Sequence, residues 1–234
     1  MAKELSILLP AYNEAAQIQR CIRQVQAHVS QFCDNFEIVV SEDGSSDGTE
    51  RIVAELAQTD QTLVLLHSPN RLGKGRAIKN AVDAAKGRIV AFMDVDLATD
   101  LDCLPKLYDV VLRTGGMAIG SRHVKGAQVY RHATRTLFSL TFNLFVRILF
   151  FDGVHDHQCG FKTMKRSVAK AVLDKSKSDG YFFDTEMIVL CKKLGYPVTE
   201  VPVVWTEKNQ GSKVNPYRDS TKILRDMLRF RFSR

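Results

Sequence analysis

The amino-acid sequence predicts an α/β fold in which a mostly parallel sheet is flanked by helices. Through the first hundred residues, short apolar runs typical of strands alternate with segments whose apolar residues recur at helical spacing. Each apolar run is followed by a polar loop, as expected where parallel strands end at one edge of a sheet. With 234 residues and 45% hydrophobic content, we predict one domain over 1–234.

The spacing of apolar residues also places the elements. We expect strands at residues 5–9, 36–40, 63–66, 89–93, 117–119 and 198–205. Helices are expected between the first four strands and again over 101–113. The tail, residues 216–234, fits a basic amphipathic helix, which favours an anionic membrane surface.

Composition narrows the classes of partner. Lys and Arg outnumber Asp and Glu by 33 to 26, giving a net charge of +7 that favours nucleotides, phospholipid surfaces or nucleic acid. We expect no nucleic-acid binding, because no recognition module accompanies the charge. The five cysteines are far apart and form no CxxC pair, so we expect reduced thiols in a cytoplasmic setting. The sequence shows neither a signal peptide nor an apolar run of 18 residues, and we expect no transmembrane helix.

Two carboxylates mark the end of the fourth expected strand. Asp94 and Asp96 follow the apolar run 89–93, so a buried strand delivers both to its exposed end. Oxygen ligands of this kind bind Mg²⁺ or Mn²⁺ when nucleotide phosphates complete the shell. The alternative is that both side chains cap the following turn.

Other charged residues are expected at the same edge. Glu14 and Asp43 follow the first two strands, whereas Arg71 and Lys74 follow the third. Acidic groups for ribose, base and metal beside basic groups for phosphate suit a metal-dependent nucleotide site. The loop at 73–75 lacks Walker A spacing, and no GxGxxG follows the first strand, which argues against P-loop NTPases and dinucleotide-binding folds.

Four motifs, in order, resemble those of family 2 glycosyltransferases, which have the Rossmann-like GT-A fold. They are Pro10-Ala11-Tyr12-Asn13-Glu14, the loop 42–49, Arg71-Leu72-Gly73-Lys74-Gly75 and Asp94-Val95-Asp96. The resemblance implies that the base and ribose of a nucleotide-sugar are held by Pro10, Tyr12, Glu14 and Asp43. It places Lys74 near the diphosphate, and Asp94 and Asp96 at the ribose, diphosphate and metal. Glu42 departs from the family, which commonly has Asp there.

An apolar helical segment is expected over 137–151. Arg135, Ser139, Asn143 and Arg147 recur every four residues and form one polar stripe along it. Fifteen residues reach about 22 Å, less than the bilayer core of about 30 Å, so the segment would lie on a membrane or dip into it. The alternative is a helix buried beneath the sheet.

Further polar groups follow in the second half. Arg122 ends the expected strand at 117–119, where it would hold a phosphate or be a solvated surface group. Asp184 and Glu186 open a helix, which their charges favour, and a general base for an inverting transfer would also come from here. Lys213 lies in a polar loop that could close over a diphosphate.

These later motifs resemble polyprenyl-phosphate sugar synthases, especially the dolichyl-phosphate glucosyltransferase branch, with the mannosyl branch next. The resemblance implies that Arg122, Arg135 and Ser139 bind a polyprenyl (dolichyl) phosphate and that Lys213 secures the donor diphosphate. It implies a nucleotide-sugar half over 1–115 and an acceptor half over 116–215. The donor, UDP-glucose or GDP-mannose, stays open, as does recruitment by a membrane protein.

The expected chemistry follows from the acceptor. A phosphate is already an anionic nucleophile, so the protein must chiefly overcome its repulsion by the leaving diphosphate, using Asp96 with its cation, Arg122 and Lys213 as catalytic groups. Asp184 and Glu186 would then be sugar ligands or helix caps. In the alternative, a saccharide or other hydroxyl acceptor, one of them is the base. A non-catalytic nucleotide-sugar-binding module is the other class. We expect an enzyme peripherally bound to the cytoplasmic face of a membrane.

Overall fold

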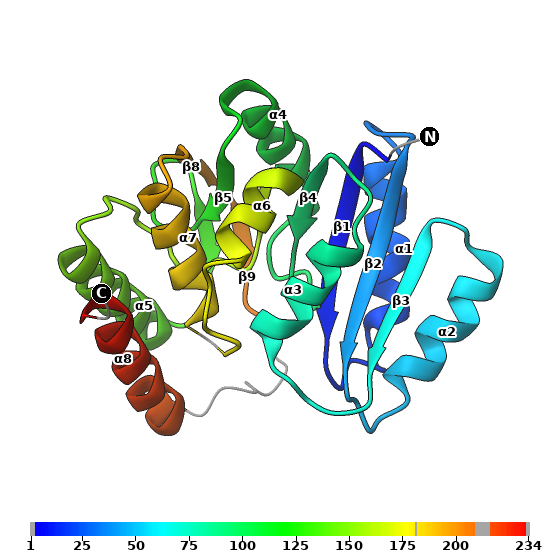
Figure 1. Ribbon diagram of the computed structural model, residues 1–234, viewed down its shortest axis with the longest axis horizontal. Coiled ribbons are helices and arrows are strands. Elements are labelled where there is room, and N and C mark those ends of the chain that lie inside the picture. The colour runs from blue at the N-terminus through cyan, green and yellow to red at the C-terminus, as the bar shows by residue number, and fades with distance from the viewer. Residues whose placement is uncertain (1–2, 181, 209–215, 233–234) are drawn as a thin grey trace.

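A seven-stranded sheet forms the centre of the protein (Figure 1). The structure, a computed structural model, describes residues 3–180, 182–208 and 216–232, without the side chains of 133–135, 137–138 and 216–222. In spatial order the strands are β3 (Leu63–Ser68), β2 (Phe36–Asp43), β1 (Leu5–Ala11), β4 (Ile89–Phe92), β7 (Lys162–Lys165), β5 (Met117–Ser121) and β8 (Val198–Pro202). All neighbours are parallel except β7, which is antiparallel to β4 and β5. The predicted mostly parallel sheet is confirmed.

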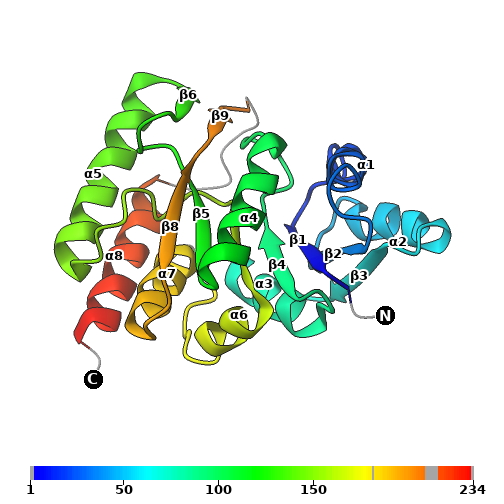
Figure 2. The same cartoon turned by 90° about the horizontal axis from the view of Figure 1, so that it is seen from above.

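Helices cover both faces of the sheet (Figure 2). They are α1 (Ile18–Val29), α2 (Thr49–Thr59), α3 (Lys74–Ala84), α4 (Leu104–Thr114, after a 3-10 turn at Leu101–Cys103), α5 (Ala133–Phe150), α6 (Arg166–Leu173), α7 (Phe183–Lys193) and α8 (Pro216–Phe232). Helices α1, α2 and α4 pack on one face, and α3, α6 and α7 pack on the other. Alternate residues of β1 serve the two cores, with Ile7 facing the first and Leu8 the second. The central strands are therefore apolar on both sides, as parallel strands under two layers of helices are.

The expected single strand over 198–205 is wrong, because the structure divides it in two. Strand β8 pairs with β5, whereas β9 (Val204–Thr206) leaves the main sheet and pairs in parallel with a short strand, β6 (Gln128–Tyr130). The Val203 N–H still donates to the Ser121 carbonyl of β5 at 3.3 Å, and the ladder with β5 ends there. The carbonyl of Val203 instead accepts a hydrogen bond from the Gln128 N–H at 3.0 Å.

Helices α5 and α8 lie side by side at the end of the molecule beyond β8 and α7 (Figures 1 and 2). Val146 of α5 and Met227 of α8 form a small core there with Phe182. The alternative that α5 is buried beneath the sheet is therefore wrong. On the outward side of α5, Leu144 is 56% and Ile148 60% exposed. Within the described ranges, none of the helices combines the length and the apolar character needed to cross a bilayer.

Candidate active site

The acidic pair Asp94 and Asp96 lies in a tight turn just after β4. The turn is closed by a hydrogen bond from the Leu97 N–H to the Asp94 carbonyl, and Leu97 takes a positive φ of 48°. Oδ1 of Asp96 accepts a hydrogen bond from the Ala98 N–H at 2.9 Å. The alternative that these side chains cap the following turn is therefore met by one oxygen, Oδ1 of Asp96. Among the residues that the structure describes, its Oδ2 has no hydrogen-bond partner, so it is available to a ligand.

These two carboxylates fit a divalent cation. Burial raises the pKa of Asp96, and repulsion by the negative charge of Asp94 raises it further. A bound cation would relieve that repulsion, and carboxylate oxygens suit Mg²⁺ and Mn²⁺. The described ranges contain no group of three or more His, Cys, Asp or Glu side chains able to hold a metal. Phosphate or water oxygens would therefore have to complete the shell.

A chain of alternating charges runs from the acidic pair into the core. Lys74, the first residue of α3, places its Nζ 2.8 Å from Oδ1 of Asp94 and 3.3 Å from Oδ2 of Asp184. Lys162 of β7 places its Nζ 2.6 Å from Oδ1 of the same Asp184. Burial raises the pKa of Asp184, but the ammonium groups of Lys162 and Lys74 outweigh it and the net pKa is lowered. Asp184 is thus a charged, doubly paired group.

Glu186 faces a different part of the fold. Its carboxylate accepts hydrogen bonds from the Ser176 hydroxyl at 2.5 Å and from the N–H groups of Lys177 and Ser178 at 3.0 Å. It therefore fixes the loop between α6 and α7. The structure does not bring Asp184 and Glu186 together at one reacting centre, because each is committed to its own partners.

The loop after β3 is held by the end of β2. The carboxylate of Asp43 accepts hydrogen bonds from the N–H groups of Leu72 and Gly73 at 2.7 and 2.8 Å. The Arg71 guanidinium lies 4.0 Å from the ring centroid of Tyr12, so the loop also packs on the residues that follow β1. The expected base and ribose contacts, Pro10, Tyr12, Glu14 and Asp43, consequently gather at this edge. Asp43 acts there by shaping the loop around them.

Gly160 is a neighbour of the acidic pair that we did not single out from the sequence. A Cβ built on it would lie 1.9 Å from Oδ2 of Asp94, closer than any real contact. Any other residue at this position would displace the Asp94 carboxylate. The motif 158–162 was visible in the sequence, but the contact, made across more than sixty residues, was not.

Arg122, which directly follows β5, is paired with a buried carboxylate. Its Nε and Nη2 donate to Oδ2 and Oδ1 of Asp156 at 2.7 and 2.8 Å, and its backbone N–H donates to Oδ2 at 2.9 Å. Burial raises the pKa of Asp156, but the guanidinium outweighs it and the net pKa is lowered. Arg122 is 9% exposed, and its guanidinium lies 5.6 Å from the Trp205 ring centroid. The pair with Asp156 uses Nε and Nη2 of the guanidinium and leaves Nη1 outside it.

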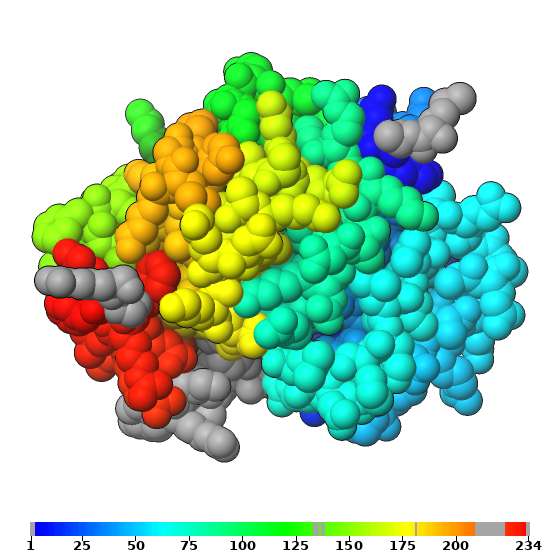
Figure 3. All heavy atoms as spheres, in the orientation of Figure 1, coloured from blue at the N-terminus to red at the C-terminus, as the bar shows by residue number. Residues whose placement is uncertain are grey.

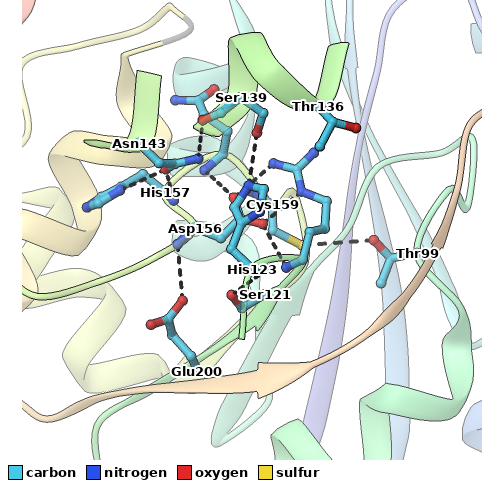
Figure 4. A network of polar contacts seen from close by, with 12 residues as sticks. Thr99, Ser121, His123, Thr136, Ser139, Asn143, Asp156, His157, Cys159 and Glu200 are labelled. Carbon is cyan, nitrogen blue, oxygen red and sulfur yellow. Dashed lines mark hydrogen bonds and ion pairs between the residues drawn. The ribbon is translucent and has the colours of Figure 1, made fainter. Parts of the chain in front are cut away.

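Two members of the polar stripe of α5, Ser139 and Asn143, face inward (Figure 4). Ser139 Oγ and His123 Nε2 lie 3.0 Å apart and share a hydrogen bond. Asn143 accepts from the His157 N–H at 2.8 Å and donates to the Ser139 carbonyl at 2.9 Å. Burial lowers the pKa of His123. Ser139 and Asn143 thus join α5 to the residues that follow Arg122 and Asp156 in the chain, His123 and His157.

Two predicted residues lie outside the described part of the structure: the whole of Lys213 and the side chain of Arg135. Another cation, which the sequence reasoning missed, lies on this side. The Arg131 guanidinium is 5.7 Å from the Trp205 ring centroid, and its Nε donates to the Thr136 hydroxyl at 3.0 Å. Trp205 also lines a small pocket with Asp94 and Asp96, so it connects the acidic and the basic groups of the site.

Comparison with known proteins identifies the family. Residues 6–173 match the Glycosyl transferase family 2 model. This chain belongs to glycosyltransferase family 2. Across 96% of its length the family 2 chain is 32% identical to a dolichyl-phosphate beta-glucosyltransferase of Drosophila melanogaster, covering 73% of that protein. It is 30% identical to the human protein of the same name, and the match covers 97% of this chain and 74% of the human protein.

A further relative is the glycosyltransferase AglD of Haloferax volcanii, 37% identical over 97% of this chain, which spans 36% of AglD's length. These relatives place the glycosyltransferase in the polyprenyl-phosphate sugar synthase group, as predicted. Glucosyl-3-phosphoglycerate synthase from Mycobacterium tuberculosis, solved with Mn²⁺ and UDP, superposes with a TM-score of 0.70 at 22% identity, covering 98% of this chain and 80% of that one. This likeness confirms the GT-A-type fold.

Proposed function

We propose that this glycosyltransferase moves glucose from UDP-glucose to a polyprenyl phosphate of the dolichyl type, with inversion at the anomeric carbon. The observation that carries the proposal is the arrangement around Trp205. The pocket that Trp205 lines contains the acidic pair Asp94 and Asp96, while the ring itself contacts two arginines, Arg122 and Arg131. Two carboxylates that can hold a cation for the donor diphosphate thus lie near the same tryptophan as two arginines that can bind the acceptor phosphate. The names of the relatives support glucose and the dolichyl acceptor.

The reaction follows from this arrangement of charge. An oxygen of the acceptor phosphate attacks the anomeric carbon in line, a new carbon–oxygen bond forms, and the bond to the donor diphosphate breaks to release UDP. Mg²⁺ or Mn²⁺ held by Asp94 and Asp96 would supply positive charge for the leaving diphosphate. Arg122 and Arg131 offset the acceptor's charge, which lowers the repulsion between the two phosphate groups. We place the donor site in residues 1–115 and the acceptor site in 116–215.

No general base is needed, since the nucleophile is already ionised. Both oxygens of Asp184 are held by ammonium groups, and Glu186 is bound to the loop 176–178. Neither carboxylate therefore offers the free oxygen that a hydroxyl acceptor would require. This favours the phosphate acceptor over the saccharide alternative.

Radiolabel transfer tests the proposal. The protein is incubated with dolichyl phosphate in vesicles, Mn²⁺ and either UDP-[¹⁴C]glucose or GDP-[¹⁴C]mannose, and the lipid fraction is counted. We expect labelled glycolipid from UDP-glucose, and its loss when EDTA removes the metal. Equal transfer from GDP-mannose would contradict the donor assignment. No lipid product from either donor would contradict the acceptor assignment.

We also propose that α5 and α8 rest on the anionic cytoplasmic face of a membrane. The outward side of α5 exposes Leu140, Leu144 and Ile148, followed by Phe151 just after the helix, and α8 exposes Leu224 and Leu228. Helix α8 adds basic residues near its C-terminal end, among them Arg229 and Arg231. Apolar side chains flanked by basic ones suit an interface with anionic lipid. Such a position would let the enzyme meet an acceptor whose chain stays in the bilayer.

The double variant Leu144→Glu, Ile148→Glu tests this surface. Each leucine or isoleucine is worth about 1.5–3 kcal/mol when buried in lipid, so we expect binding to phosphatidylserine-containing vesicles to weaken by at least about tenfold. Co-sedimentation measures it. Leu112→Glu is the matched control, because Leu112 is 51% exposed on α4, far from this face, and it should bind as the wild type does. Undiminished sedimentation of the double variant would contradict the assignment.

A further inference from the structure

We propose that Lys74 is a counter-ion for Asp94 that makes divalent-cation binding depend on the nucleotide diphosphate. Without the diphosphate, the Lys74 ammonium occupies the carboxylate and the cation binds weakly. When the diphosphate binds, it draws the ammonium away from Asp94 and leaves the carboxylate to the cation. This inference rests on the proposed function, because it assumes a diphosphate donor and a cation at Asp94 and Asp96.

The backbone of Lys74 is fixed, so only its side chain is free to move. Gly73 before it has a φ of 107°, and a Cβ there would lie 2.4 Å from the Asp179 carbonyl oxygen. Gly75 after it donates its N–H to that same oxygen at 3.0 Å. The lysine stem, in contrast, has four rotatable carbons. A change of partner at Nζ therefore requires no movement of α3.

Asp184 lets Lys74 release Asp94 without becoming unpaired. Nζ lies 2.8 Å from Asp94 Oδ1 and 3.3 Å from Asp184 Oδ2, so one partner remains when the other is exchanged. Lys162 cannot take this role, because its side chain is fully buried and is also bound to the Cys159 carbonyl at 2.7 Å. Of these two lysines, Lys74 alone reaches from the core to the half-exposed Asp94.

The balance of charge explains why the cation needs the diphosphate. The carboxylates of Asp94, Asp96 and Asp184 lie with the ammonium groups of Lys74 and Lys162, and the charge of Glu14 also acts on Asp96. A divalent cation added alone would be repelled by the Lys74 ammonium, which already pairs with Asp94. A diphosphate brings the negative charge that reverses the balance.

The structure also provides a place for the displaced ammonium group. Lys74 lines a cavity of about 630 Å³ between the start of α3, the loop before α7 and α8. Figure 3 shows the yellow segment before α7 between α3 and α8 on one face. Basic residues dominate the α3 side of the cavity, where Arg71 lies beside Lys74. A phosphate entering there would meet both side chains.

The test measures Mn²⁺ affinity, by calorimetry, without nucleotide and with UDP or GDP. For the wild type we expect the diphosphate to tighten Mn²⁺ binding by about tenfold or more. In Lys74→Met we expect Mn²⁺ alone to bind at least about fivefold more tightly than in the wild type, and the effect of the diphosphate to shrink. If Lys74 only bound the phosphate, its substitution would leave the affinity for Mn²⁺ alone unchanged. Lys74→Gln, whose thermal unfolding is checked alongside, repeats the test should the methionine variant fail to fold.

Arg71→Met is the matched control. It removes one positive charge from the same cavity, but the Arg71 guanidinium stacks on Tyr12, whereas the ion pair with Asp94 is made by Lys74. It should weaken UDP binding and leave the affinity for Mn²⁺ alone unchanged. Unchanged or weaker binding of Mn²⁺ alone in both Lys74 variants overturns the inference and leaves the proposed function standing. A wild type that binds Mn²⁺ neither alone nor with UDP or GDP overturns both.

Discussion

Replacing Asp96 with asparagine is expected to lower kcat for transfer to dolichyl phosphate by at least about a hundredfold, because the charge that holds the cation is lost. The substitution keeps the shape of the side chain and the oxygen that accepts from the Ala98 N–H. The fold should therefore persist, and a thermal unfolding curve close to that of the wild type would show it. Initial rates of radiolabel transfer at saturating Mn²⁺ measure the effect.

A matched control lies four residues further along the chain. Oδ1 of Asp100 accepts from the N–H of Asp102 at 3.0 Å, the same two-residue hydrogen bond that Asp96 makes with Ala98. Asp100→Asn alters the charge of a similar turn that is not part of the acidic pair, and it should keep most of the transfer activity. Near-normal turnover in Asp96→Asn would contradict the assignment of Asp96 to the metal.

The second large effect concerns stability. Asp184→Ala removes the partner that Lys74 and Lys162 share, leaving the buried Lys162 ammonium without a carboxylate. Breaking a buried ion pair in this way costs about 3–5 kcal/mol of unfolding free energy, which for a chain of this size lowers Tm by about 10 °C. The pKa of Asp184 is lowered in the folded state, so its contribution is present at neutral pH and is lost as the pH falls below about 4. Thermal unfolding at pH 7 and at acid pH measures both effects.

A double variant separates the lost pair from the lost packing. In Asp184→Leu, Lys162→Met both buried charges are replaced by apolar groups, which is often neutral or stabilising. The Tm of the double variant should therefore lie much closer to that of the wild type than the Tm of Asp184→Ala does. A single variant Asp184→Ala that unfolds within about 1 kcal/mol of the wild type would show that the alternating charges contribute little.

The gathering of charged residues after β1 to β4 was predictable because its information is local. Each of the strands β1 to β4 is a short apolar run that ends in polar residues, so the parallel arrangement alone brings Glu14, Asp43, Lys74 and Asp94 to one edge. The amphipathic helices between the strands supported the same register. What the sequence did not reveal is that Asp43 is occupied by the loop 72–73.

The surroundings of Arg122 and Lys162 depend on contacts between distant residues that no local pattern encodes. Arg122 pairs with Asp156, 34 positions away, in a loop without periodicity. Lys162 stands in a four-residue strand and is fully buried, although lysine is normally exposed. The inward orientation of Ser139 and Asn143 on α5 was equally hidden. A polar stripe along an apolar helix does not indicate whether it faces water or a buried network.

The packing of Asp179 against α3 has a mechanical consequence. Its carbonyl oxygen accepts from the Gly75 N–H, and no side chain fits at Gly73 or Gly75 without colliding with the loop 179–183. The start of α3 and the loop before α7, about a hundred residues apart in the chain, are thus joined backbone to backbone. Their close approach depends on the absence of a side chain at both glycines, so alanine at either position would force the two segments apart.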